Sequence, residues 1–353
     1  MSHLLVAPLH SGPIDIVGDI HGEYTTLMKL LSSLGYQENG EHPNHRKLVF
    51  VGDFCDRGPQ SPEVIFKIKE LVDNNTAQAI IGNHELNLLI HDKKDGSGWY
   101  FDERIESDNY YYAPYSRAAY TDKTEIFNFL NSLPVALENN ELRVVHACWE
   151  KQAIIKLKSQ DFNSLVEAYD YFEQTMLKQP EYMALAEAHQ HSLDQWADQL
   201  ENPKANIPYL QAIADYELFL QRVNPLKLLT SGFEVASHSP YFLGNKWRFT
   251  ARTPWWDQYD GALPVVVGHY WRLRDPKAAA TGYSKLFAQI APTQWHGHQH
   301  KVFCVDFSIG ASWRHRHPDF QHLALPYFLG ALRWPENTLH LHTGESWRLH
   351  TPG

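Results

Sequence analysis

The sequence is poor in cysteine, in basic residues and in long apolar runs. Its three cysteines, Cys55, Cys148 and Cys304, have no CxxC spacing and cannot all pair, which argues against a disulfide framework and a cysteine zinc cluster. A net charge of -10 argues against general nucleic-acid binding, because phosphate backbones attract basic surfaces. No run approaches the roughly 18 apolar residues of a membrane span, and MSHLLVAPLHSG lacks the basic start of a signal peptide. We therefore expect a globular cytoplasmic protein that does not bind membranes.

Glycine is absent between Gly98 and Gly232, and this interval divides the chain. Apolar residues recur within it at helical spacing. We expect a core formed in two parts, separated by a helical insertion, with the boundaries 1–151, 152–230 and 231–353. The insertion either caps a site or forms a packed subdomain, and its position in the chain favours the cap.

Short runs rich in Ile and Val are typical of strands buried on both faces. They are IDIV at 14, KLVFV at 47, AQAII at 77, LRVV at 142, LPVVV at 263 and KVFCV at 301. The first three alternate with two helical patterns, YTTLMKLLSSLGY and SPEVIFKIKELVD, and the second opens with Ser61 and Pro62 at plausible N-cap and first-turn positions. The alternation predicts an α/β fold, in which ligands gather beyond the carboxyl ends of strands. Near the end, LGALRWPENTLHLHTGE predicts a β-hairpin around PEN.

Polar motifs follow these strands: GDIHG, GDFCDRG, GNHE, HACWE and GHYWR. Taken singly, each has a structural explanation as a turn, a helix cap or a buried histidine. Together they bring oxygen and nitrogen ligands to one edge of the fold. Two divalent cations about 3.5–4 Å apart need one bridging carboxylate and further ligands that complete two open shells. The candidate ligands are Asp19, His21, Asp53, Asn83, His146 and His269.

The five motifs resemble those of the calcineurin-like metallophosphoesterases, over about residues 14–150 and 263–310. The Asp-Arg-Gly ending of the second motif is similar to the branch that holds the serine/threonine phosphoprotein phosphatases and the symmetrical diadenosine tetraphosphate hydrolases. The resemblance implies a four-layer α/β/β/α sandwich of two mixed sheets with a helical insertion. It also implies a phosphoester hydrolase that uses a metal-bridging hydroxide and a histidine general acid.

The same resemblance implies two divalent metal ions, and Mn, Fe and Zn all suit mixed nitrogen and oxygen ligands. One ion would be held by Asp19 and His21, the other by Asn83, His146 and His269, with Asp53 as the bridge.

The remaining roles concern the substrate. The resemblance implies that His84 is the general acid, that Asp56 orients it and that Arg57 grips the phosphate. Histidine titrates in the useful range, and the planar fork of arginine suits two phosphate oxygens. Relatives usually supply a second phosphate-binding arginine, for which we favour Arg252 over its neighbours. Stacking on nearby tryptophans or pairing with Asp257 explains that arginine equally well.

Three functions stay open at this point. The first is a phosphomonoesterase acting on a phosphoprotein or a phosphorylated small molecule. The second is a hydrolase of dinucleoside polyphosphates, which the stretch DRGPQSPEVI also resembles. The third is a metal-bound binding protein without turnover, but such a protein would normally have lost a ligand or the general acid. The sequence predicts neither the oligomeric state nor the physiological substrate.

Three further features lie outside the five motifs. The cluster HGHQH with two later histidines is better explained as a polar loop than as a third metal site. Asp306, at the end of a predicted strand, is a candidate for fixing a metal-bound histidine. The acidic and aromatic stretch at 98–115 either lines the entrance to the site or is an ordinary loop.

Overall fold

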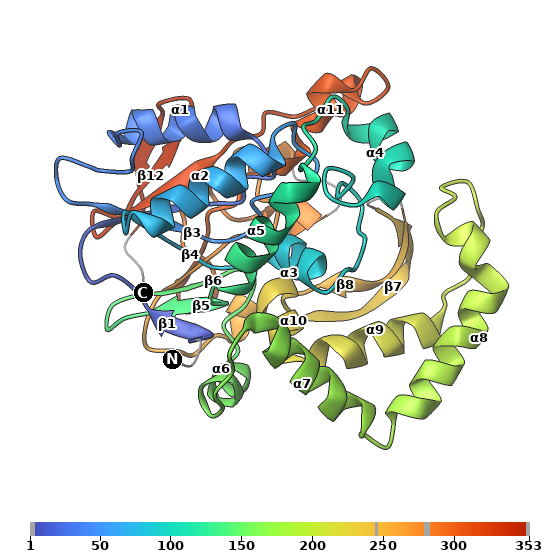
Figure 1. Ribbon diagram of the computed structural model, residues 1–353. Helices are drawn as coiled ribbons and strands as arrows, with labels where there is room; N and C mark the ends of the chain where they lie inside the picture. Colours follow the sequence, from blue (N-terminus) through green and yellow to red (C-terminus); the bar gives the residue numbers. More distant parts are fainter. Residues whose placement is uncertain (1–3, 244–245, 279–282, 351–353) are drawn as a thin grey trace.

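Two large mixed sheets packed face to face form the centre of the molecule (Figure 1). The computed structural model describes residues 4–243, 246–278 and 283–350. One sheet has the order β1-β5-β6-β9-β10, the other has the order β13-β12-β11-β2-β3-β4, and β7 and β8 form a separate hairpin. The strands are Val6–Pro8 (β1), Ile14–Val17 (β2), Lys47–Phe50 (β3), Ala77–Ala79 (β4), Ala136–Glu138 (β5), Arg143–Val145 (β6), Glu234–Phe242 (β7), Trp247–Arg252 (β8), Val265–Val267 (β9), Val302–Cys304 (β10), Gly330–Trp334 (β11), Thr338–Leu341 (β12) and Ser346–Arg348 (β13).

Helices cover the outer faces of the sheets, with α1 and α2 side by side over the sheet that holds β2 and β3 (Figure 1). No helix in the described ranges is both long enough and apolar enough to cross a membrane. The α-helices are Tyr24–Leu34 (α1), Ser61–Asp73 (α2), Asn83–Leu89 (α3), Ile105–Tyr112 (α4), Tyr120–Asn131 (α5), Lys151–Lys158 (α6), Leu165–Leu177 (α7), Tyr182–Leu200 (α8), Gln211–Val223 (α9), Pro225–Ser231 (α10) and Trp313–Arg316 (α11).

The space between the two sheets is filled by apolar side chains from both. Ile16 and Val49 of one sheet share a buried cluster with Val144, Val266 and Phe303 of the other. The opposite faces of the same strands pack against helices, which explains why the strands are apolar at nearly every position. The predicted α/β/β/α sandwich of two mixed sheets is confirmed.

The strands and helices predicted from the sequence form where they were expected. All six Ile- and Val-rich runs contain strands, β2, β3 and β4 are parallel, and β11 pairs with β12 as the predicted hairpin. The expected N-cap of α2 was wrong by one residue, because Gln60 is the N-cap and Ser61 begins the helix. The hydroxyl of Ser61 instead accepts a hydrogen bond from the backbone N–H of Asp56 at 3.0 Å.

Five helices, α6 to α10, occupy residues 151–231, where the glycine-free interval predicted a helical insertion. A separate apolar cluster joins Leu200 of α8 and Ile213 of α9 to Phe249 of β8. The β7–β8 hairpin therefore packs on these helices. The hairpin, α8 and α9 lie together at the right of Figure 1. The boundary expected between residues 230 and 231 would separate the β7–β8 hairpin from α9, which it contacts.

A buried carboxylate connects distant parts of the larger sheet. Asp15 of β2 is fully buried and accepts hydrogen bonds from Arg46 Nε at 3.1 Å, from Arg333 Nε at 2.8 Å and from the hydroxyl of Tyr36 at 2.8 Å. Arg333 lies on β11, so this network fixes the C-terminal hairpin beside β2. Burial favours the neutral carboxyl, but the bonds from Arg333 and Arg46 outweigh it and hold the pKa of Asp15 below its usual value.

Candidate metal centre

The six predicted metal ligands come together where the carboxyl ends of strands from both sheets meet. Asp19 and His21 follow β2, Asp53 follows β3, and Asn83 begins α3 after β4, all from one sheet. The other sheet supplies the two remaining histidines, which follow β6 and β9 and are His146 and His269.

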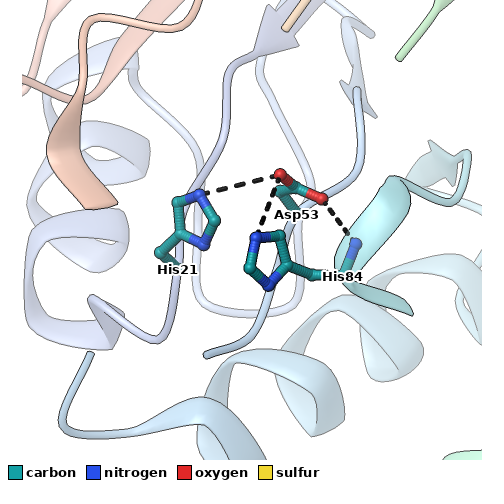
Figure 2. A group of neighbouring side chains, drawn as sticks. All are labelled: His21, Asp53 and His84. Atoms are coloured by element: carbon teal, nitrogen blue, oxygen red, sulfur yellow. Dashed lines mark hydrogen bonds and ion pairs between the residues drawn. The ribbon is translucent and has the colours of Figure 1, made fainter. Parts of the chain in front are cut away.

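Asp53 lies at the middle of this group. Its Oδ2 atom is 3.7 Å from Nε2 of His21 and 3.3 Å from Nε2 of His146. Figure 2 shows the carboxylate between His21 and His84, and its Oδ1 atom accepts the backbone N–H of His84 at 3.1 Å. Two groups of potential metal ligands share this residue, one with His21 and His84 and the other with His146 and His269.

The orientation of two histidine rings suits metal binding. Nδ1 of His21 is 2.9 Å from the carbonyl oxygen of Cys55, and Nδ1 of His146 is 2.8 Å from that of Val51. Since a carbonyl oxygen only accepts, each Nδ1 carries a proton, and Nε2 is the ring atom left to act as a metal ligand when it is unprotonated. Both Nε2 atoms face the same carboxylate oxygen of Asp53. Neutral imidazole with carboxylate would be a suitable donor set for divalent metals here.

Asn83, His269 and Asp19 extend the same group. Oδ1 of Asn83 lies 3.2 Å from Nε2 of His146 and 2.8 Å from Nδ1 of His269. The backbone N–H of His269 donates to the carboxylate of Asp19, 3.0 Å from its Oδ2. Nε2 of His269 is buried and has no hydrogen-bond partner within the described ranges. The centre thus leaves a polar atom that protein groups do not satisfy.

The centre gathers four buried carboxylates, from Asp19, Asp53, Glu85 and Asp306. Burial raises the pKa of Asp19 well above the usual range, and the charges of Asp306 and Asp53 raise it further. At Asp53 the imidazoles of His146 and His84 outweigh burial and hold its pKa well below the usual range. Buried negative charge of this density favours bound cations over isolated carboxylates.

Several of these residues have left-handed backbone conformations, which non-glycine residues rarely adopt. The φ angles are 47° at His21, 52° at Asp53 and 69° at His269. Glu85 holds one of these turns in place, because its carboxylate accepts the backbone N–H groups of Asp53 and Phe54 at 2.8 Å and that of Gly82 at 2.9 Å. Glu85 is the last residue of GNHE, but the spacing of the motif predicts no role for it.

Two motif glycines allow the motifs to approach one another. A Cβ atom at Gly82 would lie 2.2 Å from Oδ1 of Asp53, and one at Gly268 would lie 2.1 Å from Oδ1 of Asp19. Any side chain at either position would displace a carboxylate of the centre, which explains why glycine precedes Asn83 and His269.

His84, Asp56 and Arg57 lie beside the metal centre. Nδ1 of His84 is 2.5 Å from Oδ2 of Asp56, and Nε2 of His84 accepts from Arg57 Nη2 at 3.0 Å. Arg57 Nη1 lies 3.3 Å from Nε2 of His21, so the guanidinium group reaches the edge of the centre. The indole N–H of Trp99 donates to Oδ1 of Asp56 at 2.6 Å. The spacing of the motifs gave no signal for Trp99.

Two arginines near the last ligand motif differ in their surroundings. Arg252 donates to the backbone oxygen of His269 at 2.7 Å, and its Cζ lies 5.7 Å from the ring centroid of Tyr270. It therefore contacts a predicted ligand, and its role as a phosphate contact stays a prediction. Arg272 is fully buried, and burial lowers its pKa to about 10.

Asp306 acts on backbone rather than on a histidine ring in the described structure. Its Oδ2 accepts the N–H of Trp271 at 2.7 Å, and its Oδ1 accepts that of Ser308 at 2.7 Å. His296 of the histidine-rich cluster is buried and accepts the N–H of Cys304 at 2.9 Å. Within the described ranges, every gathered group of three metal-type ligands includes Asp53.

The sandwich of two mixed sheets carries this group of potential metal ligands at its edge. The family model for calcineurin-like phosphoesterases matches residues 12–214, more than half of the chain. The chain belongs to the calcineurin-like phosphoesterase family. His269 and Arg252 lie beyond the matched range.

Individual relatives cover different shares of the chain. The asymmetrical bis(5'-nucleosyl)-tetraphosphatase of Halalkalibacterium halodurans is 49% identical over 73 residues, and the match covers 20% of this chain and 30% of that relative. The symmetrical bis(5'-nucleosyl)-tetraphosphatase of Coxiella burnetii is 28% identical over 267 residues, which is 75% of this chain and 80% of the relative. Among solved structures, a cold-active protein-tyrosine phosphatase from a psychrophilic Shewanella species aligns over 98% of this chain and 84% of its own, with 15% identity and a TM-score of 0.49.

Proposed function

We propose that the protein hydrolyses phosphoesters with two divalent metal ions, Mn, Fe or Zn, bound on either side of Asp53. One observation carries this proposal: a single oxygen of Asp53 faces the Nε2 atoms of both His21 and His146, whose Nδ1 atoms are occupied by backbone carbonyl oxygens. Asp19 would complete the first site, and Asn83 and His269 would complete the second.

The residues around the centre have separable tasks. The divalent ions, when bound, supply polarisation of the phosphoryl group and a nucleophile at neutral pH. Arg57 offers two N–H groups to phosphate oxygens in a planar fork. To act as the general acid, His84 would carry protons on both ring nitrogens, with the substrate in place of Arg57 at Nε2; it would then donate the Nε2 proton to the leaving oxygen while its Nδ1–H stays on Asp56.

The substrate class separates two versions of this proposal. The first is a phosphomonoesterase, acting on a phosphoprotein or a phosphorylated small molecule. The second is a hydrolase of dinucleoside polyphosphates, and the Coxiella burnetii relative supports it because the match spans most of both chains. The tasks proposed for Arg57 and His84 are the same in both versions.

A reconstitution experiment tests the proposal. The protein would be stripped with a chelator, reloaded separately with Mn, Fe or Zn, and assayed on a phosphopeptide, an alkyl phosphate, an aryl phosphate and diadenosine tetraphosphate. We expect hydrolysis only after metal is restored. With diadenosine tetraphosphate, two molecules of adenosine diphosphate would identify symmetrical cleavage. Adenosine triphosphate with adenosine monophosphate would identify asymmetrical cleavage. Hydrolysis that is equal with and without metal would contradict the proposal.

A further inference from the structure

We propose that Trp99 is a positioning residue for the general acid, acting through Asp56. This inference rests on the proposed function, because it concerns proton donation to the leaving group. It adds to the site a residue from a segment that carries no catalytic motif.

Three buried side chains form a continuous hydrogen-bonded series. The indole N–H of Trp99 donates to Oδ1 of Asp56 at 2.6 Å, and Oδ2 of the same carboxylate accepts Nδ1–H of His84 at 2.5 Å. The exposed fractions are 1% for Trp99, 2% for Asp56 and 6% for His84. Each carboxylate oxygen thus has one side-chain donor, and the carboxylate plane is fixed from both ends.

Trp99 is itself held by groups outside the metal-binding loops. Its carbonyl oxygen accepts the N–H of Ala118 at 2.9 Å, and its ring packs edge-on to Tyr100 at 5.4 Å between centroids. The preceding residue, Gly98, donates its N–H to Asp108 at 2.7 Å. The indole therefore has a fixed position from which to hold Asp56.

The same segment also holds the backbone of Arg57. The N–H of Arg57 donates to the carbonyl oxygen of Gly96 at 3.2 Å. Asp56 and Arg57 have left-handed φ angles of 73° and 67°, so their conformation depends on such external contacts. Residues 96–99 thus support both the carboxylate that orients His84 and the residue that grips phosphate.

Loss of the indole N–H should disturb the orientation of His84 as the general acid, and it should leave the phosphate and metal contacts unchanged. Without it, Oδ1 of Asp56 is a buried acceptor with no side-chain donor, and the carboxylate can rotate away from His84. Hydrogen-bonding partners of this kind typically change activity about 10–100-fold. Phosphate binding by Arg57 and metal binding at Asp53 do not use the indole, so both should persist.

The first test is Trp99→Phe, compared on an alkyl phosphate and an activated aryl phosphate with the metal-loaded enzyme. We expect kcat for the alkyl substrate to fall about 10-fold, kcat for the aryl substrate to stay within about 2-fold, and KM to stay unchanged for both. The matched control is Trp295→Phe, which also removes a buried indole N–H, bonded to Asn337 at 3.1 Å in a different apolar cluster. It should leave the ratio of the two rates unchanged.

A shape-conserving replacement separates positioning from packing. Benzothienylalanine at position 99 keeps the two-ring shape and replaces the N–H with sulfur, so it should reproduce the loss on the alkyl substrate even if Trp99→Phe fails to fold. The double variant of Trp99→Phe with Asp56→Asn should lose no more activity than Asp56→Asn alone. An additional loss there would overturn the inference.

A spectroscopic measurement does not depend on turnover. In metal-free and zinc-loaded protein labelled with ¹⁵N-histidine, the Nδ1 proton of His84 should resonate far downfield, assigned by its absence in His84→Asn. It should move upfield or broaden in the position-99 variants and persist in Trp295→Phe. An active wild type with unchanged rate ratio and resonance in these variants would overturn this inference alone. A wild type without metal-dependent hydrolysis would overturn the proposed function and the inference with it.

Discussion

The guanidinium carbon of Arg57 lies 5.1 Å from the ring centroid of Trp271. Trp271 has a left-handed φ of 52°, and its N–H is held by Asp306 at 2.7 Å. A bulky residue in this conformation is an outlier that its surroundings must maintain. The stacking restricts the plane of the guanidinium group whose nitrogens reach His21 and His84.

Arg57→Lys should therefore weaken substrate binding more than it slows chemistry. Lysine keeps the charge but loses the planar fork and the stacking on Trp271, so we expect KM to rise about 10-fold with a smaller change in kcat. Steady-state kinetics on an aryl phosphate would measure this. Arg314→Lys, which alters a bond to Tyr327 instead, is the control. An unchanged KM would rule out Arg57 as the phosphate grip.

Asp53→Asn should remove metal from both sites, because one carboxylate oxygen faces both imidazoles. Elemental analysis is expected to find two divalent ions per wild-type chain, a large loss in the variant, and no detectable activity. The surface variant Asp73→Asn, which breaks only a pair with Lys69, should keep both ions. An active enzyme with one ion or none would refute the dinuclear assignment.

His84→Asn should keep both metals while slowing the reaction according to the leaving group. We expect the rate on an alkyl phosphate to fall by about 10²–10⁴, the usual scale for general acid catalysis, and the rate on an activated aryl phosphate to fall less. His91→Asn, which changes a ring stacked on Phe127, is the control. Equal losses on both substrates, or loss of metal, would instead make His84 a ligand or a structural residue.

Asp15→Asn should destabilise the fold without affecting the metal centre. Removing the carboxylate leaves Arg46 and Arg333 without their buried partner, which typically costs about 3–5 kcal/mol of the free energy of unfolding. Urea denaturation at neutral pH would measure the difference, with Asp73→Asn as a surface reference. A change below about 1 kcal/mol, as for surface pairs, would show that the network contributes little.

The same variant should change the acid dependence of stability. The pKa of Asp15 is lower in the folded chain than its usual 3.8, so the ionised carboxylate stabilises the fold above that value. This contribution is lost as the pH falls from the usual value through the lower, folded value. Asp15→Asn should therefore lose less stability than wild type between neutral pH and the acid range. Parallel stability curves for the two proteins would contradict this assignment.

The sequence predicted what is local in the chain. Each ligand motif directly follows an apolar run, so the position of Asp53 after β3 or of His269 after β9 could be inferred from neighbours a few residues away. The assignment of Asp19, His21 and the other ligands to the metals came from the family resemblance and stays a proposal. The side-chain geometry now gives that proposal a physical argument.

Local sequence patterns could not predict side-chain contacts between segments that are far apart in the chain. Trp99 reaches Asp56 across 43 positions in the sequence, and no spacing rule connects an indole to a carboxylate at that separation. Ser61 was expected to cap α2, but its hydroxyl is used by the N–H of Asp56. The packing of Phe249 on α8 and α9 likewise depends on how a hairpin folds back onto helices that precede it.

The pairing of β11 with β2 has a consequence for synthesis of the protein. β2 ends just before Asp19 and His21, yet one of its two neighbouring strands begins at Gly330. While the ribosome is still translating the middle of the chain, β2 exposes an unpaired edge and Asp15 lacks Arg333. The nascent chain must therefore wait for its C-terminal hairpin, and in that interval it is a candidate for chaperone binding.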